Sequence, residues 1–270
     1  MKIAILGPRG TFSEEASLRF RDRELVLCSD IADIFEKVID GDVNCGIVPV
    51  ENSLEGSVGM TLELLHKRDV KIAGEIVIDI EHDLMALPGS SLEQIKEVVS
   101  HPHALAQCKG FLKDLGVKTR NFASTAEAAK EIAEKGLRRI AAIAPRISAE
   151  LYGLEILREG IQDDEQNQTR FLIIADRDHE ETGRDKTSLI LEAKEDRPGA
   201  LFEILRPFAE ENINLTKIES RPSRRALGDY LFYIDLEGHR KEPAVKRVLE
   251  ELEKDTAHMK VLGSYPMESK

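Results

Sequence analysis

Apolar and polar positions along the chain form short apolar runs separated by amphipathic segments. The runs at 3–6, 25–27 and 45–50 have the length of buried strands. Between the second and third runs, residues 31–39 place their apolar side chains on one helical face, and Gly41 follows where a helix would end. Strand and helix therefore alternate, which predicts an α/β architecture with a largely parallel sheet.

This alternation continues as far as residue 175. We expect strands at 70–79, 80–87, 140–144 and 172–175, and helices at 92–98, 102–115, 125–135 and 146–152. Two helix starts carry the Ser/Thr-x-x-Glu capping box, which satisfies backbone N–H groups that a helix leaves free: Thr11 with Glu14, and Ser124 with Glu127. The strand at 80–87 is expected to lead into a second lobe.

A second unit follows a charged segment. Residues 176–186 are nearly free of apolar side chains, which indicates a linker. Beyond it, strands are expected at 187–193, 215–220, 230–236 and 259–264, with helices at 199–213 and 243–254. The order strand, helix, strand, strand, helix, strand is the ferredoxin-like βαββαβ plan.

The composition narrows the classes of partner. A length of 270 residues fits about two domains. The net charge of -12 argues against a nucleic-acid partner, because phosphate binding needs clustered lysine and arginine. No apolar window reaches the length of a membrane span, and the apolar start is too short for a secretory signal. Cys28, Cys45 and Cys108 form no Cys-x-x-Cys pair, which favours reduced, buried thiols in a cytoplasmic protein.

Polar side chains that can bind an anion gather where strands begin and end. The segment 167–170, Asn-Gln-Thr-Arg, directly precedes an apolar run, and 51–53, Glu-Asn-Ser, follows the strand at 45–50 with residue types that cap helices. Together they offer amides, hydroxyls and one guanidinium, but no evident nucleophile. We interpret them as a carboxylate-binding site at one edge of the sheet. Alternatively, these polar residues are simply solvent-exposed positions at the start of a buried strand.

Two other segments carry weaker signals. The loop 7–10, Gly-Pro-Arg-Gly, precedes a helix start that suits an anion, but it lacks the glycine spacing of nucleotide-binding loops. His101 and His103 lie near Cys108 without a standard zinc spacing, so no metal site is expected.

Several motifs then occur in the order in which one enzyme family carries them. The chain resembles the monofunctional prephenate dehydratases with a C-terminal ACT regulatory domain, through Gly7-Pro8-x-Gly10-Thr11-Phe12-Ser13-Glu14, Pro49-Val50-Glu51-Asn52-Ser53, Ser100-His101-Pro102, Asn167-x-Thr169-Arg170-Phe171, Gly199-Ala200-Leu201 and Glu219-Ser220-Arg221-Pro222. The resemblance implies a catalytic region at 1–178, a linker at 179–186 and an ACT domain at 187–270. Within the catalytic region, 1–78 with 160–178 would form one lobe and 79–159 the other, similar to a periplasmic binding protein. It also implies that no chorismate mutase region precedes residue 1.

The resemblance assigns roles to single residues. Asn52, Ser100, Gln107 and Thr169 would be catalytic, Thr11, Ser53, Arg170 and Phe171 would bind substrate, and Gly199, Ala200, Leu201, Glu219, Ser220, Arg221 and Pro222 would bind an effector. His103 stands where the family commonly has glutamine, and Phe202 where a smaller apolar residue is common.

The implied reaction is the loss of carbon dioxide and hydroxide from prephenate, which aromatises the ring and yields phenylpyruvate. It needs placement, a donor for the departing hydroxyl and desolvation of the leaving carboxylate, but no metal, covalent nucleophile or coenzyme. We assign Thr169 as the donor and Arg170 as the bidentate partner of a carboxylate. His101 or His103 is either the proton source or a capping and solvated side chain.

Regulation by phenylalanine follows from the same resemblance. The effector would bind between paired ACT domains, so a homodimer or homotetramer is expected. Two alternatives stay open: an enzyme that prefers arogenate, the aminated analogue of prephenate, and a non-catalytic amino-acid sensor.

Overall fold

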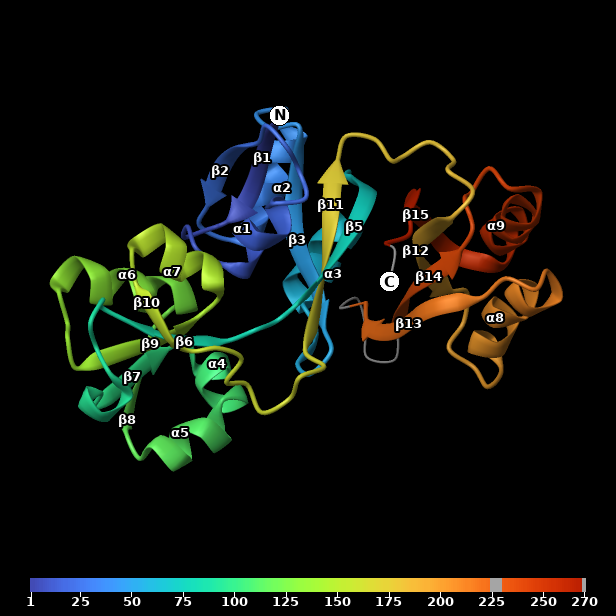
Figure 1. The fold of residues 1–270 in the computed structure, drawn as a ribbon. Coiled ribbons are helices and arrows are strands. Elements are labelled where there is room, and N and C mark those ends of the chain that lie inside the picture. Colours follow the sequence, from blue (N-terminus) through green and yellow to red (C-terminus); the bar gives the residue numbers. More distant parts are fainter. Residues whose placement is uncertain (224–229, 269–270) are drawn as a thin grey trace.

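The computed structural model describes residues 1–223 and 230–268, which form three β-sheets, each with its own helices (Figure 1). The first sheet has the order β2-β1-β3-β11-β5, with a short β4 paired to β3. Its strands are β1 (Lys2–Leu6), β2 (Glu24–Cys28), β3 (Cys45–Asn52), β4 (Gly56–Ser57), β5 (Lys71–Asp79) and β11 (Gln168–Ala175). β1 is parallel to β2 and β3, whereas β11 is antiparallel to β3 and β5. The sheet is therefore mixed, and the expected parallel arrangement is correct only for its N-terminal strands.

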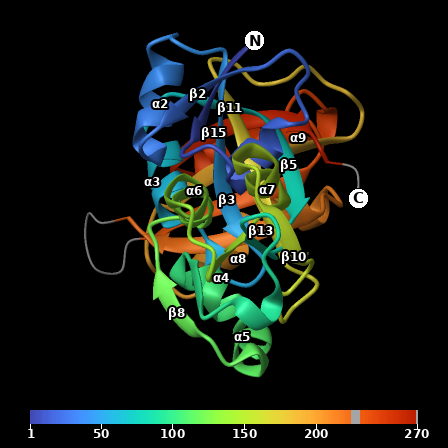
Figure 2. The ribbon, with the colours of Figure 1, turned by 60° about the vertical axis from the view of Figure 1, so that its left-hand side comes forward.

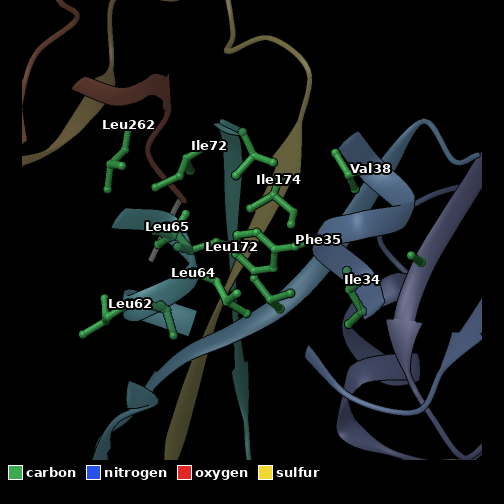
Figure 3. Packing of buried hydrophobic residues seen from close by; sticks show 14 of the residues in the cluster. Ile34, Phe35, Val38, Leu62, Leu64, Leu65, Ile72, Leu172, Ile174 and Leu262 are labelled. Carbon is green, nitrogen blue, oxygen red and sulfur yellow. The ribbon is translucent and has the colours of Figure 1, made fainter. Parts of the chain in front are cut away.

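The helices of this lobe are α1 (Phe12–Ser17), α2 (Ile31–Ile39) and α3 (Gly59–Lys67). The N-cap of α2 is Asp30, whose side chain accepts a hydrogen bond from the Asp33 N–H. It buries Ile34, Phe35 and Val38 against the sheet, as its apolar spacing predicts. Figure 3 shows this core, in which the α2 residues meet Leu172 and Ile174 of β11 and Leu62, Leu64 and Leu65 of α3.

The second sheet has the order β10-β6-β9-β7-β8. Its strands are β6 (Asp83–Ala86), β7 (Glu97–Ser100), β8 (Lys118–Asn121), β9 (Ile140–Ala144) and β10 (Glu155–Arg158), and its helices are α4 (Pro102–Gln107), α5 (Lys109–Leu115), α6 (Thr125–Lys135) and α7 (Arg146–Tyr152). The expected helix at 92–98 is wrong. Only a 3-10 turn forms (Leu92–Gln94), because the β-branched Val98 and Val99 are fully buried in a strand between β8 and β9.

Two segments connect the lobes, one between β5 and β6 and one between β10 and β11 (Figure 1). They are bonded to each other: the Ile161 N–H donates to the His82 carbonyl at 2.8 Å, and the Ile80 N–H donates to the Asn167 carbonyl at 2.7 Å. The result is a two-lobed α/β architecture.

The C-terminal domain has a four-stranded antiparallel sheet in the order β13-β14-β12-β15. Its elements are β12 (Asp185–Ala193), α8 (Ala200–Glu210), β13 (Leu215–Pro222), β14 (Tyr230–Glu237), α9 (Pro243–Asp255) and β15 (Thr256–Pro266). The predicted βαββαβ order is confirmed. β12 begins at Asp185, inside the expected linker, because its first residues already pair with β14 and β15.

One face of the C-terminal sheet packs on α8 and α9, and the other packs on the first lobe. Leu231, Tyr233, Leu262 and Tyr265 share a core with Leu62 and Leu65 of α3. In Figures 1 and 2, the second lobe and the C-terminal domain lie on opposite sides of the first sheet. Within residues 1–223 and 230–268, no helix is long and apolar enough to span a membrane.

Candidate active site

Asn52 and Thr169 lie opposite each other on the paired strands β3 and β11. Asn52 Nδ2 donates to Thr169 Oγ1 at 2.9 Å and to Asn167 Oδ1 at 2.7 Å. The Asn52 Oδ1 atom accepts from the backbone N–H groups of Leu54 and Glu55, at 2.9 and 3.0 Å, which sets the orientation of the amide. Because the Thr169 oxygen already accepts a bond from Asn52, its O–H is available to a bound molecule.

Gln107 brings the second lobe to this cluster from the last turn of α4. Its Oε1 atom accepts a hydrogen bond from Asn167 Nδ2 at 3.0 Å, and its Nε2 atom lies 3.4 Å from Glu55 Oε1. Asn167 is only 1% exposed, so this bridge between the lobes is shielded from water. Asn52, Gln107 and Thr169 thus come from distant parts of the sequence and lie together around Asn167.

His82 is a member of this cluster that sequence reasoning missed. It lies where the chain crosses between the lobes, and its Nε2 atom is 2.9 Å from Gln107 Oε1. Since Gln107 Oε1 can only accept, the imidazole carries its proton on Nε2. The ring is 3% exposed and stands edge-on to Phe12 at a centroid distance of 5.6 Å. Burial lowers the pKa of His82 below its usual value, so the ring is neutral at pH 7.

The signal for His82 was present in the sequence but weak. Glu81, His82 and Asp83 are three polar residues at the start of a segment expected to be an apolar strand. The structure shortens that strand to β6 (Asp83–Ala86), so Glu81 and His82 belong to the lobe crossing. Polar residues at a lobe crossing are candidates for a site between the lobes.

Ser53, Ser100 and Thr11 hold the backbone around the site. Ser53 Oγ donates to the Gln166 carbonyl at 3.1 Å and accepts from the Gln168 N–H at 2.9 Å. Ser100 is fully buried, and its Oγ donates to the Ile143 carbonyl at 2.6 Å. Thr11 is the N-cap of α1, as predicted. Their hydroxyls are engaged with backbone, which restricts direct contact with a substrate.

Several neighbouring expectations are corrected by the structure. The segment 51–53 does not cap a helix, because β3 continues through Asn52 and turns into β4. Phe171 is 2% exposed and belongs to the core of the first lobe. His101 is the N-cap of α4, where its Nδ1 atom accepts from the His103 N–H at 3.3 Å. His103 Nδ1 lies 3.1 Å from Glu55 Oε2, at the outer edge of the cluster.

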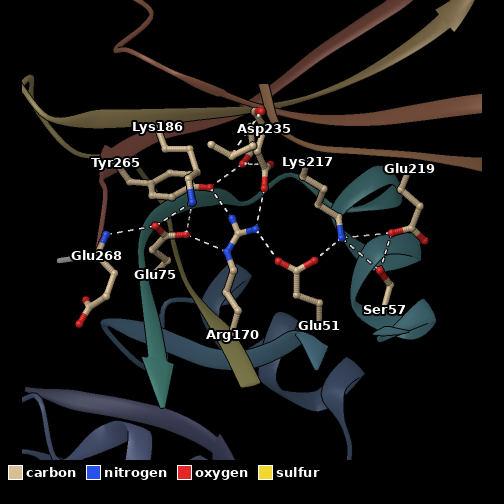
Figure 4. A network of polar contacts seen from close by, with 12 residues as sticks. Glu51, Ser57, Glu75, Arg170, Lys186, Lys217, Glu219, Asp235, Tyr265 and Glu268 are labelled. Atoms are coloured by element: carbon tan, nitrogen blue, oxygen red, sulfur yellow. Dashed lines mark hydrogen bonds and ion pairs between the residues drawn. The ribbon is translucent and has the colours of Figure 1, made fainter. Parts of the chain in front are cut away.

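Arg170 does not join this cluster. Its guanidinium points to the opposite face of β11, where it pairs with Glu51, Glu75 and Asp235 (Figure 4). The cause is the strand itself, since consecutive side chains of a strand project to opposite faces. Thr169 and Arg170 are adjacent and therefore cannot both face the same site.

The residues expected to bind an effector fall into three groups. Gly199, Ala200 and Leu201 line a hollow of about 480 Å³ together with Glu192, Ala193, Glu195, Asp196, Arg197, Phe202, Leu205, Tyr230 and Phe232. Gly199 is the N-cap of α8 in the left-handed conformation, with φ of 91°, which favours glycine. Glu219 and Arg221 instead face the first lobe: Glu219 Oε2 accepts from Ser57 Oγ at 2.5 Å, and Arg221 lies against Gly59. Ser220 and Pro222, on alternate positions of β13, face the other way.

The cysteines and the acidic groups supply no further chemistry here. Cys28, Cys45 and Cys108 are free and buried, and burial raises their thiol pKa values to about 12, 11 and 12. Among the residues that the structure describes, no three His, Cys, Asp or Glu side chains are grouped to hold a metal ion.

The architecture defines the class: a two-lobed α/β protein with a ferredoxin-like domain at its C-terminus. The prephenate dehydratase family model matches residues 3–179, and the ACT domain model matches residues 187–254. The chain belongs to the prephenate dehydratase family and is a hydro-lyase.

Individual relatives agree with this assignment. The chain is 43% identical to a prephenate dehydratase of Methanocaldococcus jannaschii, with 96% of each chain covered. It is 40% identical to arogenate dehydratase/prephenate dehydratase 2 of Arabidopsis thaliana, covering all of this chain and 74% of that one. The solved structure of a prephenate dehydratase from Arthrobacter aurescens in complex with L-Phe superposes with a TM-score of 0.90 at 36% identity, covering 99% of this chain and 90% of that one.

Proposed function

We infer that the chain converts prephenate to phenylpyruvate by decarboxylative dehydration, a step toward L-phenylalanine. The observation that carries the mechanism is the Asn52–Thr169 pair, with Gln107 brought to it from the second lobe. Prephenate loses carbon dioxide and hydroxide, and the electron pair of the broken carbon–carbon bond completes the aromatic ring. Thr169 donates a hydrogen bond to the departing hydroxyl, and this bond strengthens as negative charge grows on the oxygen.

Asn52 and Gln107 orient the reacting groups. Asn52 holds the Thr169 oxygen through its amide N–H, so the threonine proton is directed toward the substrate. Gln107 ties the second lobe to the first through Asn167, which places the substrate between the lobes and away from water. Because Arg170 is engaged with three carboxylates, we assign substrate recognition to uncharged donors rather than to this guanidinium.

The test is turnover of prephenate by the purified chain, measured as phenylpyruvate formed. Thr169→Ala removes the donor, and we expect kcat to fall roughly 10²- to 10³-fold with little change in KM, as for the loss of one well-aimed donor. Thr169→Ser keeps the hydroxyl and serves as the matched control, with activity within about tenfold of wild type. Wild-type kcat in the folded alanine variant would remove Thr169 from the mechanism.

Arogenate is the second candidate substrate, favoured by the name of the Arabidopsis relative. Side-by-side kcat/KM values for prephenate and arogenate decide which is preferred. A chain that binds either acid but turns over neither would be an amino-acid sensor, the other alternative.

For regulation, we propose that L-phenylalanine binds in the hollow beside Gly199, Ala200 and Leu201. The support is the L-Phe complex of the Arthrobacter enzyme together with the apolar lining of this hollow. Phe202 is 69% exposed and Tyr230 44%, which suits burial against a second copy in a homodimer or homotetramer. Sedimentation with and without L-phenylalanine tests both assignments.

The cytoplasmic location stays a prediction, supported by three free thiols.

A further inference from the structure

Strands β3 and β11 carry two different clusters on their two faces. Asn52 and Thr169 project to one face, and their chain neighbours Glu51 and Arg170 project to the other. Glu51 and Arg170 are themselves direct partners across the strands, and Arg170 Nη1 lies 2.9 Å from Glu51 Oε1. The site residues and the buried ion pair therefore occupy adjacent cross-strand pairs of the same two strands.

The C-terminal domain supplies part of the second cluster (Figure 4). Arg170 Nη1 lies 2.6 Å from Asp235 Oδ2 of β14, and its Nη2 donates to the Tyr265 hydroxyl of β15 at 2.9 Å. Arg170 Nε forms an ion pair with Glu75 of β5 at 2.7 Å. Ser188 completes the cluster, because its Oγ donates to Asp235 Oδ1 and is 2.6 Å from the Tyr265 hydroxyl.

Two lysines of the C-terminal domain neutralise the other carboxylates. Lys186 of β12 binds both oxygens of Glu75, at 2.8 and 2.9 Å. Lys217 of β13 pairs with the second oxygen of Glu51. Each of the two first-lobe carboxylates is thus held between Arg170 and a lysine from the other domain. Arg170 and Asp235 are less than a tenth exposed, so losing a partner leaves a buried charge without compensation.

The ladder between β3 and β11 is interrupted at this point. The register shifts between Arg170 and Phe171, so Arg170 pairs with Glu51 but Phe171 pairs with Pro49. Such a bulge leaves one residue unpaired and weakens the ladder that would otherwise hold the strand ends in place. The position of Asn52 relative to Thr169 then depends more strongly on side-chain contacts.

We propose that Arg170 is a positioning residue for the reaction: through Asp235, the ACT domain holds the β3–β11 strand ends at which Asn52 and Thr169 stand. An effector bound to the ACT domain would then alter the site by shifting Asp235 and the strands that it clamps. This regulatory step rests on the proposed dehydratase function, whereas the clamp itself is a property of the fold.

Asp235→Asn tests the clamp, because it removes one charge on the ACT side and touches no site residue. We expect kcat for prephenate to fall roughly tenfold, with a smaller change in KM, since binding groups remain in place. Hydrogen exchange should quicken in the peptides that contain β3 and β11.

Lys260→Met is the matched control: Lys260 joins the same two domains through the carbonyls of Leu65, His66 and Arg68, away from β3 and β11. Its kcat and its exchange in these peptides should stay within twofold of wild type.

A second experiment compares wild type and the same variants with and without L-phenylalanine. In wild type, L-phenylalanine should change both kcat/KM and the hydrogen exchange of the β3 and β11 peptides. In Asp235→Asn both effects of L-phenylalanine should be much smaller. Calorimetry should show that this variant still binds L-phenylalanine. If Asp235→Asn and Lys260→Met give the same exchange in these peptides, the proposal is overturned. Absence of prephenate turnover in wild type would instead refute the dehydratase function, and the exchange data would still decide whether the clamp exists.

Discussion

At the scale of single residues, neighbours in one strand have unrelated tasks. Thr169 faces the lobe junction, and Arg170 faces the C-terminal domain. The motif around them suggested one common site, because residues that are adjacent in sequence were assumed to act together. The period of two in a β-strand argues against that assumption and was available from the sequence. What the sequence could not supply was the partner of Arg170, since Asp235 lies 65 positions away.

His82 makes stability depend on pH. Burial lowers the pKa of His82 in the folded chain below its ordinary value of about 6.5. In the unfolded chain His82 keeps this ordinary pKa, so the unfolded chain binds the proton more readily than the folded chain. The free energy of unfolding should therefore decrease as the pH falls from about 7 toward 5. Thermal unfolding at a series of pH values measures this effect.

The matched variant is His82→Gln, which keeps a donor near Gln107 and does not titrate. Its stability should vary less with pH over the same range. An identical slope in the variant and the wild type would show that His82 is not the titrating group.

At the scale of elements, the two domains are joined by a close approach of β15 to β5. A Cβ atom on Gly263 would lie 2.2 Å from the Ile72 carbonyl oxygen and 2.9 Å from its nitrogen. Backbone atoms cannot move aside as a flexible side chain would. Only glycine fits here, and this close approach brings Tyr265 on the same strand within reach of Arg170.

Gly263→Ala should therefore separate β15 from β5 and destabilise the chain by about 1–3 kcal/mol, the usual range for overpacking. Denaturant unfolding measures the loss, and hydrogen exchange in the β5 and β15 peptides locates it. Ala257→Ser, at an exposed position of the same strand, is the control and should be nearly neutral. Unchanged stability in Gly263→Ala would mean that the two strands are less tightly packed than described.

At the scale of the whole molecule, acid should weaken the contact between the domains. Burial alone would raise the pKa values of Asp235 and Glu51. Arg170, Ser188 and Lys186 nevertheless hold the pKa of Asp235 below its usual value. Lys217 and Arg170 do the same for Glu51. A carboxylate whose pKa is lowered by folding stabilises the folded chain at pH values above its pKa in the unfolded chain, about 4. This stabilisation is lost as the pH falls through the pKa of the carboxylate in the folded chain.

We therefore expect the unfolding temperature to drop steeply below about pH 4. Asp235→Asn should be less stable than wild type at pH 7, and the difference should shrink as the solution is acidified. Scanning calorimetry of both chains from pH 7 to pH 3 measures it. A difference that stays constant over this range would mean that the pKa of Asp235 is the same in the folded and the unfolded chain.

Local pattern was sufficient for much of the architecture. The apolar spacing of 31–39 predicts the buried face of α2, the hydroxyls of Thr11 and Ser124 predict two helix starts, and the order of segments after residue 186 predicts the βαββαβ domain. These features depend on neighbours within a few positions of the chain, so they can be read directly along it. The helix expected at 92–98 failed because sheet burial outweighed local periodicity.

The amino-acid sequence alone was enough to indicate the family, the two units and the residue types of the site. Only the folded chain shows that Gln107 reaches Asn167 across the lobes, that His82 joins them, and that Arg170 belongs to the contact between domains. The partners of a buried polar group are decided by which sheets meet and which faces they present. Contacts between the sheets result from apolar packing over the whole chain, so they cannot be deduced from any single segment.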